Sequence, residues 1–267
     1  MTKYRMICAD IDGTLVTSDN RLTPRTKETV KKAVSQGAVF ALISARPPEG
    51  MFYLNDEIGI DQYIVSFGGS LILKRGQEPL YADVLETEQV KEIYEMSHKT
   101  SLNLSIYEGE NLFVESIDWR VELEHKIARA VPQVVDFQEL FRRGVRPCKL
   151  LYLGEPEEIQ SFMNKAREHF QGRLNIYTSK PDYLEVCPLT STKMSGIDHL
   201  AAHFGIGREE IMAIGDQFND LSMIEEAGPG VAMGNAPEGV KEKADFVTLT
   251  NDEDGVAYAI EKFVLEQ

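Results

Sequence analysis

The stretch 6–15, which reads MICADIDGTL, constrains the fold more than any other part of the chain. Its first four residues are apolar, which is typical of a strand buried on both faces. The strand ends at Asp10 and Asp12, and alternate residues of a strand point the same way. Two carboxylates so close stay ionised together only beside a cation, unless one of them holds a proton. The stretch therefore predicts a chemical site at a strand end, although a strand followed by an Asx-type turn at Gly13 would have the same sequence.

The same pattern of strand and helix recurs along the chain. Three further apolar runs have the length of buried strands, at 38–43, 63–67 and 211–214. Helical segments separate the strands, so the pattern predicts a parallel sheet covered on both faces. Ligands of such sheets bind at the carboxyl ends of the strands. Asp10, Ser44 and Gly68 each follow a strand at that end, which strengthens the prediction of a site.

The middle third of the chain has a different pattern. Between about residues 83 and 187, helices alternate with paired strands, which predicts an α+β domain inserted into the parallel one. The predicted core is therefore discontinuous, over residues 1–82 and 188–267. Residues 83–187 would form a cap domain. We expect its aromatic residues Tyr107, Phe113 and Trp119 to pack in its own core.

Composition and charge exclude several classes of partner. The formal net charge is -15, which argues against nucleic acid and against anionic membrane surfaces. A small phosphorylated substrate remains compatible with this charge if a metal and a few cations offset the local field. The three cysteines form no C-x-x-C pair, the N-terminus has no signal-peptide pattern, and no apolar run is long enough to span a membrane. We expect a cytoplasmic protein and make no prediction of its oligomeric state.

Hydroxyl, amine and carboxylate groups follow the predicted strands. They are Asp10, Asp12, Ser44, Lys193, Asp216, Asn219 and Asp220. Hard oxygen ligands are those that Mg²⁺ prefers, usually one or two carboxylates together with substrate phosphate. One carboxylate of such a set can attack phosphorus, and a second can protonate the leaving oxygen and later activate water. The set therefore favours phosphoryl transfer, which depends mainly on positioning and charge stabilisation.

These segments resemble a known family. DIDGTL at 10–15, Ser44, Lys193 and GDQFND at 215–220 are similar to the four ordered motifs of the haloacid dehalogenase-like (HAD) phosphatases. The chain more narrowly resembles the Cof-type hydrolases, which carry a large α/β cap between the second and third motifs. The segments AGPGVAMGNA and TNDEDGVAYAI, nearer the C-terminus, are also similar to that subfamily. The resemblance implies an α/β fold with a Rossmann-like parallel-sheet core and an inserted cap.

The resemblance assigns roles to the acidic motifs. Asp10 would be the nucleophile and a magnesium ligand. Asp12 would be the general acid/base and would lend its backbone carbonyl to the metal. Asp216 would be the third ligand from the protein. Asn219 and Asp220 would act around the metal and the phosphate, directly or through water.

The resemblance also assigns the groups that hold the substrate. Ser44 and Lys193 would bind the phosphoryl group, and Lys193 would reduce the repulsion between phosphate and the nucleophile. Thr14 would shape the loop beside the phosphate, and Gly68 and Gly69 would line the substrate pocket.

Two positions depart from the family pattern. The second motif usually ends in Thr-Gly-Arg, but here it reads Ser44-Ala45-Arg46 and keeps the hydroxyl. The lysine is usually followed by Gly, but here Met194 follows and leaves less room beside it. Neither change removes a reacting group.

The implied function is a magnesium-dependent phosphatase of small phosphorylated metabolites, such as sugar phosphates or phosphorylated cofactors. Two alternatives remain open at this point. A phosphomutase would also form the aspartyl-phosphate but would pass the group to another hydroxyl. A phosphorylatable signalling or binding protein would hold the phosphate without turning it over.

Overall fold

The structure, a computed structural model, describes residues 3–265 and divides the chain into two compact units. The first unit comprises the chain up to Ala45, Met51–Tyr81 and the chain from Thr192 onward. The second unit comprises Arg46–Gly50 and Ala82–Ser191. From the sequence, we predicted a core of residues 1–82 and 188–267, which includes Arg46–Gly50. The use of the second unit as a cap stays a prediction.

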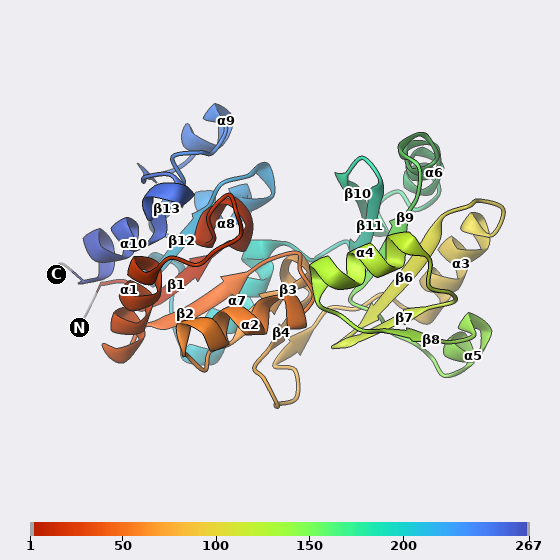
Figure 1. Ribbon diagram of the computed structural model, residues 1–267, viewed down its shortest axis with the longest axis horizontal. Helices are drawn as coiled ribbons and strands as arrows, with labels where there is room; N and C mark the ends of the chain where they lie inside the picture. Colours follow the sequence, from red (N-terminus) through yellow and green to blue (C-terminus); the bar gives the residue numbers. More distant parts are fainter. Residues whose placement is uncertain (1–2, 266–267) are drawn as a thin grey trace. The chain divides into compact units, whose positions relative to one another are not determined.

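The first unit is built on a mainly parallel sheet (Figure 1). Within residues 3–265 the sheet has eight strands in the order β14-β13-β12-β1-β2-β3-β4-β5. The strands are β1 (Met6–Ala9), β2 (Val39–Ile43), β3 (Ile64–Ser66), β4 (Leu71–Leu73), β5 (Tyr81–Ala82), β12 (Ile211–Gly215), β13 (Gly230–Ala232) and β14 (Phe246–Val247). All neighbours from β14 to β3 pair in parallel, and β4 pairs with β3 in the antiparallel direction. The predicted parallel-sheet core is confirmed.

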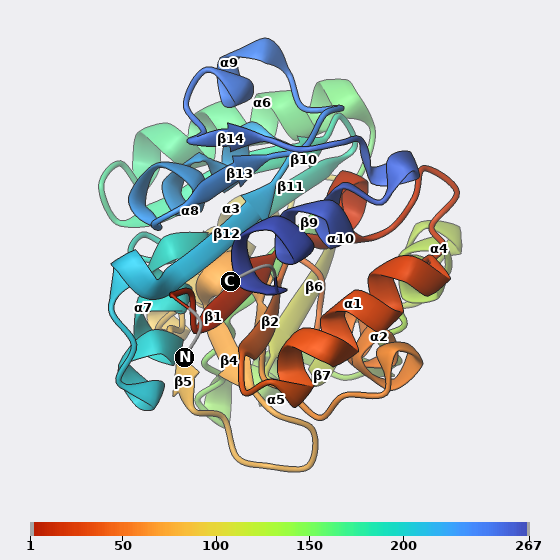
Figure 2. The same cartoon turned by 90° about the vertical axis from the view of Figure 1, so that its left-hand side faces the viewer.

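Helices cover both faces of this sheet, with α1 and α10 on one side and α7 and α8 on the other (Figure 2). The helices of the first unit are α1 (Pro24–Ser35), α2 (Glu49–Ile58), which begins in the second unit, α7 (Lys193–Phe204), α8 (Leu221–Glu226), α9 (Glu238–Lys241) and α10 (Gly255–Ile260). Met194 of α7 packs with Met6 and Cys8 of β1 in a buried apolar cluster. The central strands are therefore apolar throughout because both of their faces are covered.

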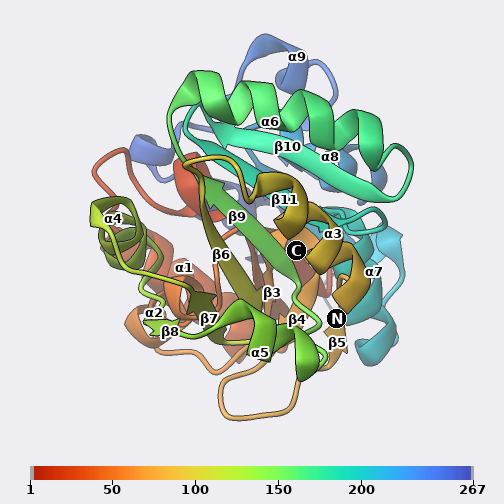
Figure 3. The ribbon, with the colours of Figure 1, turned by 90° about the vertical axis from the view of Figure 1, so that its right-hand side faces the viewer.

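The second unit is an α+β arrangement, as predicted, in which the helices at 87–97, 137–142 and 156–169 pack on one face of a mixed sheet (Figure 3). The strand order within the described residues is β10-β11-β9-β6-β7-β8. Its strands are β6 (Asn103–Glu108), β7 (Asn111–Val114), β8 (Pro132–Val134), β9 (Lys149–Leu153), β10 (Leu174–Lys180) and β11 (Tyr183–Pro188). Its helices are α3 (Thr87–Ser97), α4 (Trp119–Ala128), α5 (Phe137–Arg142) and α6 (Pro156–His169).

Two parts of the second unit differ from expectation. The short elements β8 and α5 were not predicted, because three and six residues are too few for periodicity to identify. Tyr107 and Phe113 are buried as expected, but Trp119 is 63% exposed at the first position of α4. That prediction was wrong because an aromatic residue by itself does not show which face of a helix is buried.

None of the helices within residues 3–265 combines the length and the apolar composition needed to cross a bilayer.

Two glycines bring the start of α7 against the turn that follows β3. A Cβ atom on Gly69 would lie 2.0 Å from the carbonyl oxygen of Thr192, the residue before α7. A Cβ atom on Gly196 would lie 2.8 Å from the Cα of Gly69. The two backbones can approach this closely only because both positions lack a side chain. This contact fixes the end of α7 that carries Lys193.

We expect Gly69→Ala to destabilise the protein by at least about 2 kcal/mol more than Gly68→Ala. Both glycines have positive φ, at 116° and 66°, but nothing lies within 4 Å of a Cβ on Gly68. The difference therefore reports the close approach to Thr192 together with the less favourable φ of Gly69, which lies outside the left-handed region. Chemical denaturation of the two variants measures the difference, and equal losses would contradict the packing role of Gly69.

Candidate active site

The strands that carry the predicted site residues are neighbours in the sheet. β1 lies between β12 and β2, with Met6 opposite Ile211 and Val39 in the two ladders. Parallel strands in register end at the same edge of the sheet. Asp10, Ser44 and Asp216 directly follow these three strands, so sequence segments some 200 residues apart meet at one edge.

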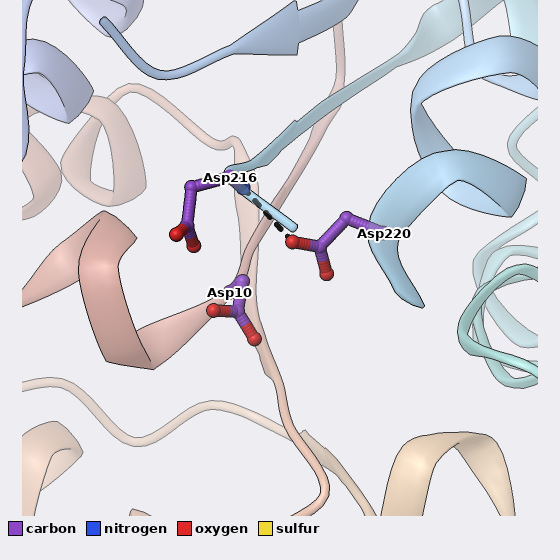
Figure 4. A group of neighbouring side chains, drawn as sticks. All are labelled: Asp10, Asp216 and Asp220. Carbon is purple, nitrogen blue, oxygen red and sulfur yellow. Dashed lines mark hydrogen bonds between the residues drawn. The ribbon is translucent and has the colours of Figure 1, made fainter. Parts of the chain in front are cut away.

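Three carboxylates converge at this edge (Figure 4). One oxygen from each of Asp10, Asp216 and Asp220 can be chosen so that all three atoms lie within 4.8 Å of one another. The residues are 7%, 3% and 0% exposed, respectively. Like charges at this spacing in a buried setting repel strongly, so the cluster requires positive charge or protons.

Lys193 supplies one positive charge to the cluster. Its Nζ donates a hydrogen bond to Asp10 Oδ1 at 2.6 Å and another to Asp220 Oδ1. Lys193 is the first residue of α7, where Thr192 is the N-cap and its hydroxyl accepts the backbone N–H of Ser195. Burial alone would lower the pKa of Lys193. The negative charges of Asp10 and Asp220 have the larger effect, so the pKa is raised. The amine is therefore charged.

One ammonium does not offset three buried carboxylates. Burial, the opposing effect of Lys193 and the negative charge of Asp220 together raise the pKa of Asp10 to about 7. Burial also raises the pKa of Asp216, although the hydrogen bond from Thr14 opposes this. The site is thus short of positive charge, as expected of a cluster that binds a cation.

Asp12 does not belong to the converging group. The sequence suggested that Asp10 and Asp12 face one point, but β1 ends at Ala9 and the two acids lie in the turn that follows. A tight helical turn begins at Ile11, directly after Asp10, so the two-residue repeat of a strand no longer applies. Asp12 is exposed, whereas Asp10 is buried. The two acids therefore have different environments.

Two side chains orient Asp216 from either side. Thr14 Oγ1 donates to Asp216 Oδ1 at 3.0 Å, and Gln217 Nε2 donates to Asp216 Oδ2 at 3.0 Å. The hydroxyl of Thr14, assigned to the phosphate by resemblance, is thus directed at a carboxylate. Gln217 was not identified from the sequence. Its position inside the motif GDQFND is the signal that could have identified it.

Asp220 holds the loop together. Its Oδ2 accepts the backbone N–H groups of Asp216 and Gln217, each at 2.9 Å, while Oδ1 accepts from Lys193. Asp220 precedes α8, but its side chain makes no capping hydrogen bond to that helix. Asp220 therefore links the lysine to the backbone of the Asp216 loop.

The remaining predicted residues lie around this cluster in different ways. Ser44 is buried, and its backbone N–H donates to Val65 while its carbonyl accepts from Gly68. Asn219 is exposed in the turn before α8. Gly69 is buried against the start of α7, which gives it a packing role as well as the expected pocket role.

Asn235 is a further site residue that the sequence did not single out. It follows β13, and its Nδ2 donates to the Gly13 carbonyl at 2.9 Å. The rule that drew attention to Ser44, a polar residue beyond the carboxyl end of a parallel strand, would also have found it.

The donor set fits a divalent cation with hard oxygen preference. Asp10 Oδ1 is bonded to Lys193, and no hydrogen bond to Oδ2 is recorded within residues 3–265. Each oxygen of Asp216 accepts one hydrogen bond, so Asp10 and Asp216 have carboxylate capacity left for a cation, whereas Asp220 already accepts three hydrogen bonds from the lysine and the loop. Two carboxylates, rather than three, match the usual protein contribution to a Mg²⁺ site.

Comparison with known proteins identifies the same segments. A family model described as haloacid dehalogenase-like hydrolase matches residues 7–260. A Haemophilus influenzae protein named "Putative phosphatase" is 34% identical, over 97% of this chain and 98% of its own length. A Bacillus subtilis 5-amino-6-(5-phospho-D-ribitylamino)uracil phosphatase is 27% identical, over 98% of this chain and 96% of its own length.

Solved structures are similar over the same extent. A haloacid dehalogenase-like hydrolase from Bacteroides thetaiotaomicron has a TM-score of 0.89 at 37% identity, covering 97% of this chain and 99% of that one. A HAD subclass IIB sugar phosphatase has a TM-score of 0.79 at 29% identity, covering 97% of this chain and 98% of that one.

We expect Mg²⁺ to raise the melting temperature by more at about pH 8 than at about pH 5. The pKa of Asp10 is raised to about 7. Without a cation, the stability that Asp10 contributes to the folded state therefore falls as the pH rises from the ordinary pKa of an aspartate through 7. At the higher pH the cluster is ionised and binds the cation without displacing protons. Thermal unfolding with and without Mg²⁺ measures the shift.

Asp216→Asn is the matched variant for this measurement, because it keeps the shape of the side chain and removes one charge. It should lose most of the magnesium-dependent shift. A wild-type shift in this variant, or a shift in the wild type that is larger at the lower pH, would contradict the proposed cation site.

Proposed function

The chain belongs to the haloacid dehalogenase-like hydrolases and is a phosphoric monoester hydrolase, and from this premise we propose that it is a magnesium-dependent phosphatase of small phosphorylated metabolites. The observation that carries the proposal is the contrast between its two motif acids: Asp10 is buried against Lys193, while Asp12 is exposed beside it in the chain. This contrast supports Asp10 as the attacking acid and Asp12 as the acid that exchanges protons.

In the proposed reaction, a carboxylate oxygen of Asp10 attacks the phosphorus atom and the bond to the ester oxygen breaks. Asp12 gives its proton to the departing oxygen, so the alcohol leaves neutral. Water then attacks the phosphorus of the aspartyl-phosphate, Asp12 takes a proton from that water, and inorganic phosphate leaves with Asp10 restored. Each group returns to its starting state after one turnover.

The other residues position charge for these steps. We propose that Asp10, Asp216 and the backbone carbonyl of Asp12 hold the magnesium ion. When bound, the ion would offset the charge of the phosphoryl group. Lys193 and the Ser44 hydroxyl would hold the phosphoryl oxygens.

Substrate class is proposed from the named relatives. One relative is named for a phosphate ester of a ribityl-substituted pyrimidine, and a similar structure is named as a sugar phosphatase. We therefore expect sugar phosphates, or cofactor precursors that carry a phosphorylated sugar alcohol. We propose that the second unit is the cap that selects among them.

The net charge of -15 disfavours nucleic acid as a partner, and three free, buried cysteines are consistent with the cytoplasm.

We expect Asp10→Asn to abolish turnover while the protein stays folded, because an amide cannot form the acyl-phosphate. Release of inorganic phosphate from a panel of phosphometabolites, with and without Mg²⁺, measures the activity. Wild-type-like turnover in this variant would remove the nucleophile assignment. Phosphate release by the wild type without a bisphosphate activator separates a phosphatase from a phosphomutase.

We expect Asp12→Asn to lower kcat/KM for an alkyl phosphate by about 10²–10⁴-fold, the usual contribution of general acid/base catalysis. The loss should be smaller for p-nitrophenyl phosphate, because p-nitrophenolate leaves readily without a proton. Steady-state kinetics on both substrates provide the comparison. An unchanged rate on the alkyl ester would mean that another group carries the proton.

A further inference from the structure

Two side chains hold the carboxylate of Asp216 at different oxygen atoms. Thr14 Oγ1 donates to Oδ1 and Gln217 Nε2 donates to Oδ2, each at 3.0 Å. Gly13 limits the space beside Oδ2, because a Cβ atom on this glycine would lie 2.5 Å from that oxygen. With a donor on each oxygen, the carboxylate cannot turn about its Cβ–Cγ bond without breaking a hydrogen bond. The two bonds therefore fix the plane of the Asp216 carboxylate.

The side chain of Gln217 can be changed without removing the bonds that hold its loop. The loop is held through backbone groups, since Asp220 Oδ2 accepts the N–H groups of Asp216 and Gln217, each at 2.9 Å. Any substitution by a residue other than proline keeps both of these donors. The side chain of Gln217 is exposed, so its truncation opens no buried cavity. The orientation of Asp216 can therefore be tested separately from the fold of the loop.

The other predicted carboxylate ligand is also held by a donor. Lys193 Nζ donates to Asp10 Oδ1 at 2.6 Å. One oxygen of Asp10 and one of Asp216 can be chosen so that they lie within 4.8 Å of each other (Figure 4). The cation site therefore offers two carboxylates whose directions are set by their neighbours.

Ligands held in this way matter more for Mg²⁺ than for Ca²⁺. Mg²⁺ requires nearly octahedral geometry, with oxygen ligands at about 2.0–2.1 Å. Ca²⁺ accepts about six to eight oxygen ligands at about 2.3–2.6 Å, in a flexible geometry. A change that lets one carboxylate turn should therefore weaken the binding of Mg²⁺ more than the binding of Ca²⁺.

We propose that Gln217 is a positioning residue for the cation, and that it favours Mg²⁺ over Ca²⁺ by holding the plane of Asp216. The inference rests on the proposed function, because it uses Asp216 as a ligand of the magnesium ion. Gln217 does not itself bind the cation in this account. It acts through Asp216 Oδ2.

A general supporting role for Gln217 predicts a different result. If its side chain only stabilised the loop, its loss would weaken the binding of both cations alike and would lower the melting temperature measured without a cation. If it orients Asp216, its loss should act mainly on the cation with the stricter geometry. The ratio of the two dissociation constants therefore separates the two roles.

The test is Gln217→Met, which keeps a side chain of similar length but has no N–H to donate. Melting temperatures of the full chain are measured at about pH 8 over a range of MgCl₂ or CaCl₂ concentrations, and each series gives an apparent Kd. We expect the Kd for Mg²⁺ to rise about 10–100-fold, the usual effect of losing a group that orients a metal ligand, and the Kd for Ca²⁺ to rise less than about threefold. The melting temperature without a cation should change little.

The matched control is Gln160→Met, at an exposed glutamine of α6 that bonds Asn164. Both dissociation constants should stay at their wild-type values in this control. A second variant, Gln217→Ala, removes the amide without adding a thioether and should change the ratio in the same direction as Gln217→Met. Equal weakening of both cations, or wild-type affinity for Mg²⁺ in either variant at position 217, would overturn the inference.

The outcome is distinguishable from failure of the proposed function. If Mg²⁺ does not raise the melting temperature of the wild type, or raises that of Asp216→Asn as much, the proposed cation site fails and this inference fails with it. If those two proteins behave as expected and the Gln217 variants bind both cations as the wild type does, only the role of Gln217 is wrong.

Discussion

The ion pairs of Lys193 with Asp10 and Asp220 are the interaction on which the rest of the site depends. Charges buried this deeply are costly unless they are paired, and removing one partner leaves the others uncompensated. The fold accordingly fixes the lysine from several directions. It stands at the capped start of α7, Gly69 and Gly196 let that start approach the turn after β3, and Asp220 ties it to the Asp216 loop. Backbone packing around the start of α7 thus decides where one ammonium lies.

Asp10 and Asp12 look alike in the sequence but have different environments in the structure. Desolvation and the neighbouring carboxylates raise the pKa of Asp10. Asp12 lies two residues further on, in the turn after β1, and is exposed to solvent. A buried carboxylate next to a lysine is suited to reacting and to binding a cation, whereas an exposed one can exchange protons with water. The turn that follows β1 therefore gives these two acids different environments, and the hydrogen bonds of Thr14 with Asp216 and of Asn235 with Gly13 tie this turn to neighbouring loops.

The sequence predicted the elements of the first unit well because long apolar runs and capping residues are local signals. It also brought Asp10, Ser44 and Asp216 to one edge, since the carboxyl ends of parallel strands meet. It could not show that Asp12 is exposed while Asp10 is buried, because the strand ends before both acids and the turn that carries them has no two-residue repeat. Nor could it show that Gln217 and Asn235 bond to the site, because those contacts depend on how loops from different strands pack. Short elements such as β8 and the exposure of Trp119 were missed for the same reason: neither is encoded by local periodicity.

The pairing of β1 with β12 also limits the order in which parts of the protein can fold during synthesis. Met6 lies beside Ile211, so the central strand lacks one neighbour until the ribosome has produced most of the chain. At about 5–20 residues per second, that delay is roughly 10–40 s. During this time β1 presents an apolar strand with an unpaired edge, which is the kind of surface that chaperones recognise and that aggregates form on. The main segment of the second unit, Ala82–Ser191, is continuous and complete before β12 emerges, so it can fold while the first unit waits.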